Sequence, residues 1–189
     1  ANGEQLWYDK DGNVTNEFRE SDKVMTGKTY DAPWMGGFGT SFRWKGLQLS
    51  AQFSWIGTRY VINNDRYFEE GGVTFGTAYN QSRRVLYNRW KNPGDITDIP
   101  KWGEVNQLDD RYLENASFLR LKNLSLSYSL PQAWLSKTKF FTLVRIYAQA
   151  QNLFTITGFN GLDPEVSSNV YQAQYPASRQ FTLGMEVSF

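Results

Sequence analysis

The sequence has 189 residues, enough for one domain of ordinary size, and its formal net charge of +1 gives no electrostatic footprint for a polyanion such as nucleic acid. It contains neither cysteine nor histidine, which excludes disulfides, thiol catalysis, Ser-His-Asp triads and nearly all zinc sites. Aromatic residues make up 16% of the chain, although its mean hydropathy is -0.56. This combination fits either a β-rich binding module with aromatic platforms or a membrane barrel with alternating lipid-facing and lumen-facing residues.

Residues 1–34 are predicted to form a loop, with no apolar core of a signal peptide, and we expect the chain to be part of a longer one. Asp9, Asp11 and Asn13 have the spacing of ligands in a calcium-binding loop. The carboxylate expected near Phe18 is missing, so an Asp-Gly turn is the alternative. Calcium is therefore a weak hypothesis, and no other cofactor or metal is expected.

A β-hairpin is predicted over residues 35–56. Apolar residues alternate with glycine and polar residues over 35–44, and the alternation over 47–55 is almost without error. Lys45-Gly46 between them is a tight-turn signal. Each strand has about ten residues, the length that a tilted strand needs to cross a bilayer.

Residues 57–116 show no sustained periodicity and are predicted to form one long extracellular loop without regular structure. The loop is rich in aromatic, arginine and asparagine side chains. Rings can stack on sugar faces or apolar groups, while Asn and Arg supply directional hydrogen bonds. Packing of the rings against the loop itself or against a capping protein is the simpler alternative. The residues concerned are Tyr79, Arg83, Arg84, Tyr87, Trp90, Asn92 and Trp102.

Three further strands are predicted in the remaining sequence. The first covers residues 117–130, and its alternation slips by one residue at Asn123, which indicates a β-bulge. A connector over 131–142, with one helical turn, leads to a strand over 143–156. The last strand covers 179–189.

A second long loop is predicted over residues 158–176. Asp163 and Glu165 could contact a ligand from this loop, but the simpler hypothesis is that they order the turn around Pro164. Asn160 in the same loop is a further candidate for ligand contact.

Long and short connections alternate along the chain. Counted back from the last strand, the segments 1–34, 57–116 and 158–176 all fall on one side, as the extracellular loops of outer-membrane barrels do. Aromatic strand ends such as Trp44 and Trp55 suit an interfacial girdle. The predicted strands are too few to close a barrel, since the smallest barrels have about eight, so they must pair with others. A soluble antiparallel β-sandwich is the alternative, because alternation marks any half-buried strand.

Two stretches of the sequence carry a resemblance to a known family. Residues 118–131 read FLRLKNLSLSYSLP, and residues 145–154 read RIYAQAQNLF. The second stretch is followed by GLDPE at 161–165 and YPASRQFTLG at 175–184. In this order they closely resemble the C-terminal region of SusC-like (RagA-like) TonB-dependent outer-membrane transporters, and so does the hairpin with its Lys-Gly-Leu turn.

The resemblance implies an all-β fold in which this chain supplies the last five strands of an antiparallel transmembrane β-barrel of about 22 strands, with long extracellular loops. It implies a location in the outer membrane of a Gram-negative bacterium and the uptake of oligosaccharides or peptides together with a SusD-like lipoprotein. The other implied partners are the remaining barrel strands and plug, the lipid bilayer, and TonB through a part of the protein outside these residues. The alternative function is glycan binding by a soluble β-sandwich module.

Candidate site residues follow from the two faces of the strands and from the loops. Polar faces would line the lumen and contact the plug, because a charge that faces lipid costs about 2–4 kcal/mol at the midplane. The apolar residues of the last strand would form the signal that the insertion machinery reads. Lumen candidates are Arg43, Gln48, Gln52, Arg145, Gln149 and Glu186; assembly-signal candidates are Phe181, Leu183, Met185, Val187 and Phe189; substrate candidates are Arg83, Arg84, Tyr87, Trp90, Asn92, Trp102 and Asn160.

No catalytic residue is predicted. The adjacent carboxylates Glu69-Glu70 and Asp109-Asp110 could suggest glycoside hydrolysis, but neighbouring residues seldom point at one bond. A hydrolase is therefore a third and weaker hypothesis, and the chain is not expected to be an enzyme.

Overall fold

The computed structural model describes residues 2–71 and 80–189, so the candidate Tyr79 lies outside the described residues. The chain divides into two compact units, each made from three separate segments. The first unit gathers most of the residues predicted as loops, and the second gathers the predicted strands. The first unit contains residues 1–31, 60–115 and 166–174, and the second contains residues 32–59, 116–165 and 175–189.

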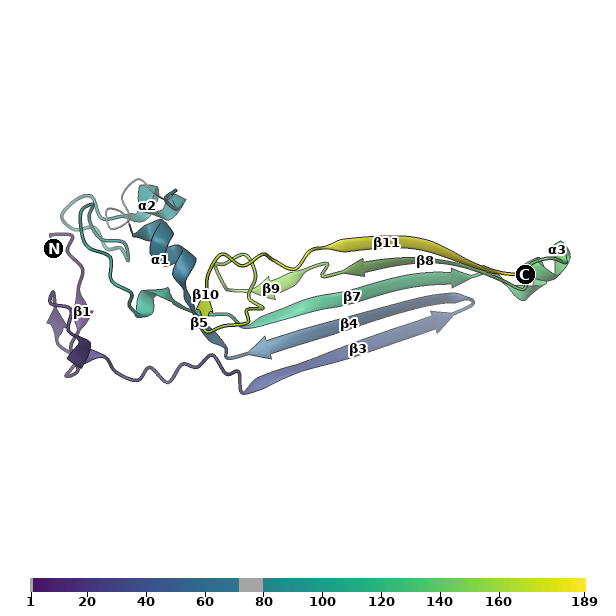
Figure 1. Ribbon diagram of the computed structural model, residues 1–189, viewed down its shortest axis with the longest axis horizontal. Coiled ribbons are helices and arrows are strands. Elements are labelled where there is room, and N and C mark those ends of the chain that lie inside the picture. Colours follow the sequence, from purple (N-terminus) through teal and green to yellow (C-terminus); the bar gives the residue numbers. More distant parts are fainter. Residues whose placement is uncertain (1, 72–79) are drawn as a thin grey trace. The chain divides into compact units, whose positions relative to one another are not determined.

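The second unit is built on one antiparallel sheet of long strands in the order β11-β8-β7-β4-β3 (Figure 1). The predicted antiparallel all-β arrangement of five long strands is confirmed. The bounds of these strands are Trp34–Trp44 for β3, Leu47–Gly57 for β4, Phe118–Ser129 for β7, Leu143–Gln151 for β8 and Gln180–Ser188 for β11.

The turn between β3 and β4 is the tight turn that Lys45-Gly46 predicts. Both residues have positive φ, 44° and 87°, as the two central residues of a type I′ turn require. A Cβ at Gly46 would lie 2.5 Å from the carbonyl oxygen of Ser129 on the neighbouring strand. Glycine therefore serves both the turn geometry and the close approach of β7.

A bulge in β7 lies at the predicted slip. Gln52 of β4 pairs with Asn123, whereas Phe53 pairs with Leu121, so Lys122 is the extra residue. The backbone carbonyl of Lys122 accepts a hydrogen bond from the Asn152 N–H at 3.1 Å.

The strand predicted over residues 143–156 is interrupted, which corrects the prediction of one continuous strand. Asn152, directly after β8, adopts a left-handed conformation with φ 52°. Pairing with β7 resumes only at β9, Thr155–Thr157. The physical reason is the bulge in β7. Its extra residue shifts the pairing with the neighbouring strand by one residue, so the regular ladder of hydrogen bonds breaks there.

Strand register places residues of like polarity opposite one another over most of the sheet, with Thr40 opposite Ala51 as an exception. Because side chains alternate between faces, each row across the strands lies on one face. A representative apolar row is Leu183, Ala148, Leu126, Leu49 and Phe42, and the adjacent polar row is Thr182, Gln149, Ser125, Ser50 and Ser41.

The first unit has a small core formed by short elements. Val61, Tyr112 and Tyr171 are almost completely buried in it. A three-stranded sheet in the order β10-β5-β6 supports this core, with β5 parallel to β10 and antiparallel to β6. The elements are β1 Trp7–Tyr8, β2 Val14–Thr15, η1 Glu20–Asp22, β5 Tyr60–Asn63, α1 Asn64–Glu70, α2 Arg83–Asn88, η3 Asp110–Tyr112, β6 Leu113–Asn115 and β10 Val170–Tyr171.

The prediction that residues 57–116 lack regular structure is wrong. The described part of this segment contains α1 and α2, which begin at capping residues. Asn63 accepts a hydrogen bond from the Arg66 N–H at 3.2 Å, and Ser82 accepts one from the Arg84 N–H at 3.3 Å. The two helices have seven and six residues, too few to show a clear helical period. They could therefore not be predicted from the pattern of apolar residues.

The connector between β7 and β8 forms a helix, α3, over Gln132–Thr138, longer than the single turn predicted. Lys139 ends it in a left-handed conformation. Within residues 2–71 and 80–189, no helix is long and apolar enough to cross a membrane.

Candidate functional site

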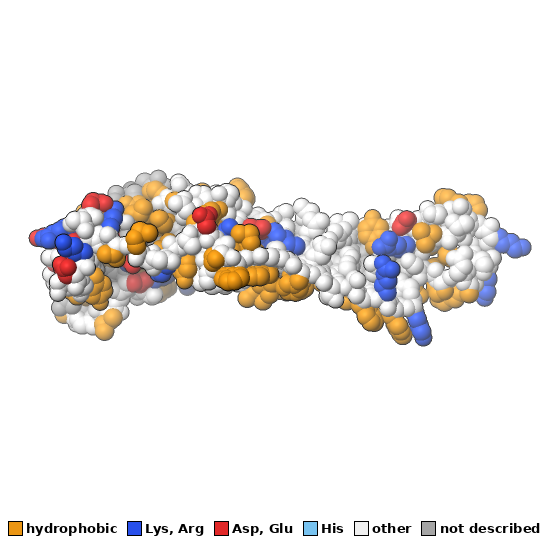
Figure 2. All heavy atoms as spheres, turned by 90° about the horizontal axis from the view of Figure 1, so that it is seen from below, with side chains coloured by type: hydrophobic (Ala, Val, Ile, Leu, Met, Phe, Trp, Pro, Cys, Tyr) orange, Lys and Arg blue, Asp and Glu red, His pale blue; other side chains and the backbone are white. Residues whose placement is uncertain are grey.

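One face of the sheet that the five long strands form exposes apolar side chains. Leu183 is 79% exposed and Phe38 is 54% exposed, although both lie in the middle of their strands. Seen towards the β3 edge, hydrophobic side chains gather towards the two ends of the sheet, with a largely white stretch between them (Figure 2). Every strand of the second unit, whose residues are all described, belongs to this one sheet, so no second sheet in it covers the apolar face. An exposed apolar surface of this extent marks contact with lipid or with another protein.

The opposite face carries small polar and charged side chains that bond to one another across strands. The hydroxyls of Ser50 and Ser125 lie 2.7 Å apart, and the Gln149 amide donates to the Asn123 amide oxygen at 3.1 Å. Strand register places all of the lumen candidates on this face: Arg43, Gln48, Gln52, Arg145, Gln149 and Glu186. Their role in lining a lumen or contacting a plug stays a prediction.

A buried ion cluster at the end of β7 escaped the sequence analysis. The guanidinium of Arg120 donates to Asp163 and, at 2.7 Å, to Glu165, and its Nε donates to the Thr155 hydroxyl at 2.8 Å. Lys122 also donates to Glu165, at 2.7 Å. In the sequence, Arg120 is an arginine at a polar position of a predicted strand. That position does not reveal which residues it pairs with.

Asp163 and Glu165 therefore hold their loop on β7. Asp163 also accepts the backbone N–H of Glu165 at 2.9 Å and that of Ala177 at 2.8 Å, in agreement with the hypothesis that these carboxylates order the turn. Burial raises the pKa of Asp163, but the hydrogen bonds from Ala177, Arg120 and Glu165 outweigh burial and hold the pKa below its usual value.

The first unit contains a second buried ion cluster, centred on Arg66. Its guanidinium makes a two-bond contact with Glu70, at 3.1 and 3.0 Å, and donates to Glu114. Arg84 donates to Glu70 at 2.6 Å and to Asp98. Burial lowers the pKa of Arg66, but the hydrogen bonds and charges of Glu70 and Glu114 more than offset it and raise the pKa overall.

The substrate candidates do not form one site. Arg84 belongs to the ion cluster just described, whereas the Arg83 guanidinium lies 5.7 Å from the ring centre of Tyr87 on the same helix. Trp90 packs against Gly3, where a Cβ would lie 2.5 Å from the indole. The backbone N–H of Asn92 donates to Asp95, and Asn160 belongs to the other unit. Whether any of these residues contacts a substrate stays a prediction.

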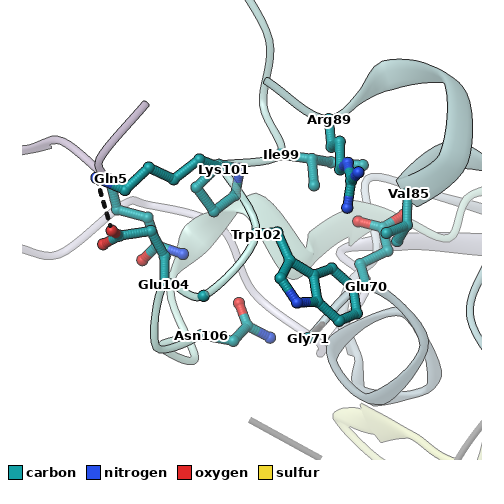
Figure 3. A pocket seen from close by; sticks show the side chains of 12 residues that line it. Gln5, Glu70, Gly71, Val85, Arg89, Ile99, Lys101, Trp102, Glu104 and Asn106 are labelled. Carbon is teal, nitrogen blue, oxygen red and sulfur yellow. Dashed lines mark ion pairs between the residues drawn. The ribbon is translucent and has the colours of Figure 1, made fainter. Parts of the chain in front are cut away.

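Trp102 is the one substrate candidate that lines a small cavity of the first unit, among the residues that the structure describes. The cavity has a volume of about 20 Å³, enough for one water molecule. Figure 3 shows Trp102 in the middle of the lining residues, with Arg89, Val85 and Glu70 to one side of it and Lys101 and Glu104 to the other. The guanidinium of Arg89 lies 5.4 Å from the Trp102 ring centre, a cation–π contact.

A much larger cavity, of about 860 Å³, lies between the N-terminal segment and residues 97–113. Trp7 and Phe18 line it and pack edge to face, with ring centres 5.6 Å apart. The Trp7 indole N–H donates to Asp109 at 3.2 Å. No substrate site was predicted in residues 1–34, because these residues show no periodicity and no recognisable motif apart from the Asp-Gly turn.

The Asp-Gly turn joins β1 to β2. Asp9 accepts the backbone N–H groups of Asp11 and Asn13 at 2.9 and 2.8 Å, and the backbone and side chain of Asn13 are the main cause of the lowered pKa of Asp9. Among the described residues, no group of three or more acidic side chains is placed to hold a metal ion. Calcium binding by Asp9, Asp11 and Asn13 stays a prediction.

One carboxylate of each adjacent pair is held by structural partners, Glu70 in the first pair and Asp109 in the second. Burial and the neighbouring Asp65 and Glu70 raise the pKa of Glu69, but Glu70 itself is bound by two arginines. Asp109 accepts from Trp7 and from the Arg111 guanidinium, the latter at 3.0 Å. Glu70 and Asp109 are therefore engaged in ion pairs, whereas glycoside hydrolysis requires two carboxylates that flank one bond.

Comparisons with known proteins identify relatives over almost the whole chain. No protein-family model matches the sequence. The chain is 30% identical to TonB-dependent receptor P3 of Formosa agariphila over 99% of its own length and 19% of that receptor. It is 29% identical to TonB-dependent receptor SusC of Bacteroides thetaiotaomicron over 98% of its own length and 18% of that receptor. The chain thus spans about a fifth of the length of these curated relatives.

Solved structures give the same result in three dimensions. The chain superposes on the RagAB peptide importer in the open-open state with a TM-score of 0.89 and 40% identity, over 99% of this chain and 21% of the other. A second structure of the RagAB peptide transporter gives a TM-score of 0.90 at 40% identity and the same coverage. These relatives are named as receptors and transporters rather than enzymes, and the predicted barrel-segment fold agrees with them along its length.

Proposed function

We propose that this chain, which belongs to the SusC-like (RagA-like) TonB-dependent receptors, forms one stretch of the wall and outer loops of an outer-membrane nutrient importer. In this proposal the five long strands cross the outer membrane of a Gram-negative bacterium, and the first unit lies among the extracellular loops. The remaining strands and the plug of the same protein complete the barrel around the polar face.

The observation that carries the proposal is the uniform polarity of the rows across the sheet. From β11 to β3 the row that contains Leu183 is apolar throughout and exposed, while the row that contains Thr182 is polar throughout. A soluble β-sandwich would bury such an apolar face under a second sheet. A membrane barrel turns it to lipid and keeps the polar face for the lumen.

Transport by the whole protein would take up oligosaccharides or peptides, with a SusD-like lipoprotein as surface partner and TonB as the source of energy. SusC and the RagAB peptide importer, both similar to this chain, support these assignments. The ion clusters around Arg66 and Arg120 fit a function in which the loops present a fixed surface, because neither cluster leaves its buried charges unpaired.

Extraction of the full-length receptor from outer membranes in mild detergent tests this proposal. We expect a band that shifts on a gel when the sample is boiled, and a lipoprotein that co-purifies. A receptor that is soluble without detergent and shows no heat-dependent shift would contradict the membrane location and favour a soluble glycan-binding module.

A further inference from the structure

The end of the sheet that carries α3 is formed by three segments of the second unit. In the turn between β3 and β4, the backbone carbonyl of Gly46 accepts the Ser129 N–H of β7 at 2.9 Å. Just before β8, the Thr142 N–H donates to the backbone carbonyl of Ser188 in β11 at 2.8 Å. Figure 1 shows this turn, α3 and the last residue of the chain at the same end of the long strands. We call this end the α3 rim, and it comprises residues 43–48, 127–145 and 185–189.

The α3 rim is rich in basic side chains that lack acidic partners. Lys45, Lys137 and Lys139 are exposed, and none of them forms an ion pair with any residue that the structure describes. The one acidic side chain of the rim, Glu186, lies on the polar face, 3.7 Å from Arg145. Figure 2 shows basic side chains projecting from this end of the sheet, at the right of the view. The buried ion cluster at the other end of β7 has no such surplus, because its arginine and lysine are paired with carboxylates.

Aromatic rings border these lysines. The Nζ atom of Lys45 lies 5.1 Å from the ring centre of Trp44, which is exposed at the end of β3. Phe189 continues the apolar phase of β11, and its ring packs edge to face against Phe140, with ring centres 5.0 Å apart. Trp134 in α3 is also exposed, as are both phenylalanines. The aromatic part of the rim is therefore continuous with the apolar face of the sheet.

This arrangement has the chemistry of the layer in which lipid headgroups meet acyl chains. Aromatic rings concentrate there in barrel proteins, and lysine side chains extend along the apolar surface so that the ammonium reaches the headgroups. Because the three lysines have no carboxylate of the described residues to neutralise them, a negatively charged headgroup supplies the missing counter-charge. A zwitterionic headgroup does so less well, since its own cation repels the lysines.

We propose that the α3 rim binds the phosphate groups of anionic phospholipids, with Lys45, Lys137 and Lys139 as the cations and the neighbouring rings at the level of the upper acyl chains. A lipid fits better than an acidic protein, because the rings continue into the apolar face that the proposed function turns towards the bilayer. The proposal rests on that function, which puts the α3 rim on the periplasmic side, and it adds a lipid preference that transport itself does not require.

Native mass spectrometry of the full-length receptor, purified in mild detergent, tests this preference. The receptor is titrated with phosphatidylglycerol and, separately, with phosphatidylcholine that has the same acyl chains. The lysine variant combines Lys45→Gln, Lys137→Gln and Lys139→Gln. The matched control removes the same charge from exposed lysines of the first unit and combines Lys10→Gln, Lys28→Gln and Lys91→Gln.

We expect wild type and the control to bind phosphatidylglycerol about tenfold or more tightly than phosphatidylcholine. The lysine variant should lose about tenfold or more in affinity for phosphatidylglycerol, because each lysine near an anionic surface contributes a factor of about five. It should bind phosphatidylcholine like wild type. Since the three lysines are exposed, the lysine variant should also keep the heat-dependent gel shift of wild type.

Equal binding of the two lipids by wild type would overturn the proposal. So would an equal loss of phosphatidylglycerol binding in the lysine variant and the control, or no loss in either. A soluble acidic protein that is released by the lysine substitutions, without any lipid preference in wild type, would assign the α3 rim to a protein instead. The importer function would survive all of these results, because the heat-dependent gel shift and the co-purified lipoprotein test it separately.

Discussion

Arg120 on β7 and Asp163 in the loop after β9 form an ion pair that is almost completely buried, although 43 positions separate them in the sequence. Glu165 and Thr155 each accept a further hydrogen bond from the arginine. Removal of one member of a buried pair leaves an uncompensated charge, and the penalty is larger than the net stabilisation of the intact pair. The loop is therefore fixed to the sheet by a small number of charges.

We expect Arg120→Met to lower the free energy of unfolding by about 3–5 kcal/mol, because Asp163 stays buried without its counter-charge. The midpoint of denaturant unfolding of the full-length receptor in detergent measures this effect. Lys137→Met on the exposed end of α3 is a control that should change the midpoint little. A loss of less than 1 kcal/mol in Arg120→Met would show that water reaches Asp163.

Acidification should weaken the same contact. The folded state lowers the pKa of Asp163 below its usual 3.8, so the stabilisation is fully present above that value and is lost as the pH falls through the lower, folded-state pKa. Wild type should lose more stability than Asp163→Asn when unfolding is measured between about pH 4 and pH 2. Parallel pH profiles for the two proteins would contradict the lowered pKa.

The effect on stability of a substitution at Gly184 should depend on the side chain at Tyr147. The tyrosine ring covers the glycine on the polar face, and a Cβ at position 184 would lie 2.3 Å from a ring carbon. Gly184→Ala should therefore cost about 1–3 kcal/mol of stability, the usual range for overpacking. Gly158→Ala is a matched control, since nothing lies within 4 Å of a Cβ there.

The double variant Gly184→Ala, Tyr147→Ala tests whether the loss of stability comes from the clash with the Tyr147 ring or from a change in the backbone at position 184. With the ring removed, the added methyl group has space, and the second substitution should restore part of the lost heat resistance on a gel. This explanation would be contradicted if the double variant lost more stability than the two single variants lose together.

Arg66→Met should loosen the first unit, because it leaves Glu70 and Glu114 without their shared counter-charge. We expect limited proteolysis of the receptor to cut within residues 60–115 at least tenfold faster than in wild type, as a loss of about 1.4 kcal/mol or more in local stability implies. Arg83→Met on the neighbouring helix removes an exposed arginine and should leave the rate unchanged. Equal rates for Arg66→Met and wild type would exclude the ion cluster as the support of this unit.

The sheet could be predicted because its signal repeats in every strand. The alternation of residues 47–55 indicates a strand, and the slip at Asn123 indicates the bulge that the structure places beside it at Lys122. The interruption at Asn152 could not be predicted, because it is caused by the bulge in β7, a different strand. Alternation within one segment says nothing of its neighbour's register.

The candidate site was harder to predict than the fold. Arg84, Trp90 and Trp102 were selected by residue type, and the structure assigns them to an ion pair, a contact with Gly3 and a small cavity. Gln5 carries no sequence signal, because it is distinguished only by the lack of a hydrogen-bond partner for its amide among the described residues. Long-range pairs such as Arg120 with Asp163 are likewise set by topology, which residue patterns in one sequence do not encode.

Spin labels on the two faces of the sheet test the membrane account most directly. Labels at Leu183, Ala148 and Leu126 should be accessible to oxygen, which concentrates in lipid, and protected from a water-soluble nickel reagent, when the receptor is reconstituted in bilayers. Labels at Thr182, Gln149 and Ser125 should show the reverse or full protection from both reagents. If the labels at Leu183, Ala148 and Leu126 instead respond to the nickel reagent as strongly as exposed loop positions do, the apolar face does not contact lipid and the importer proposal is contradicted.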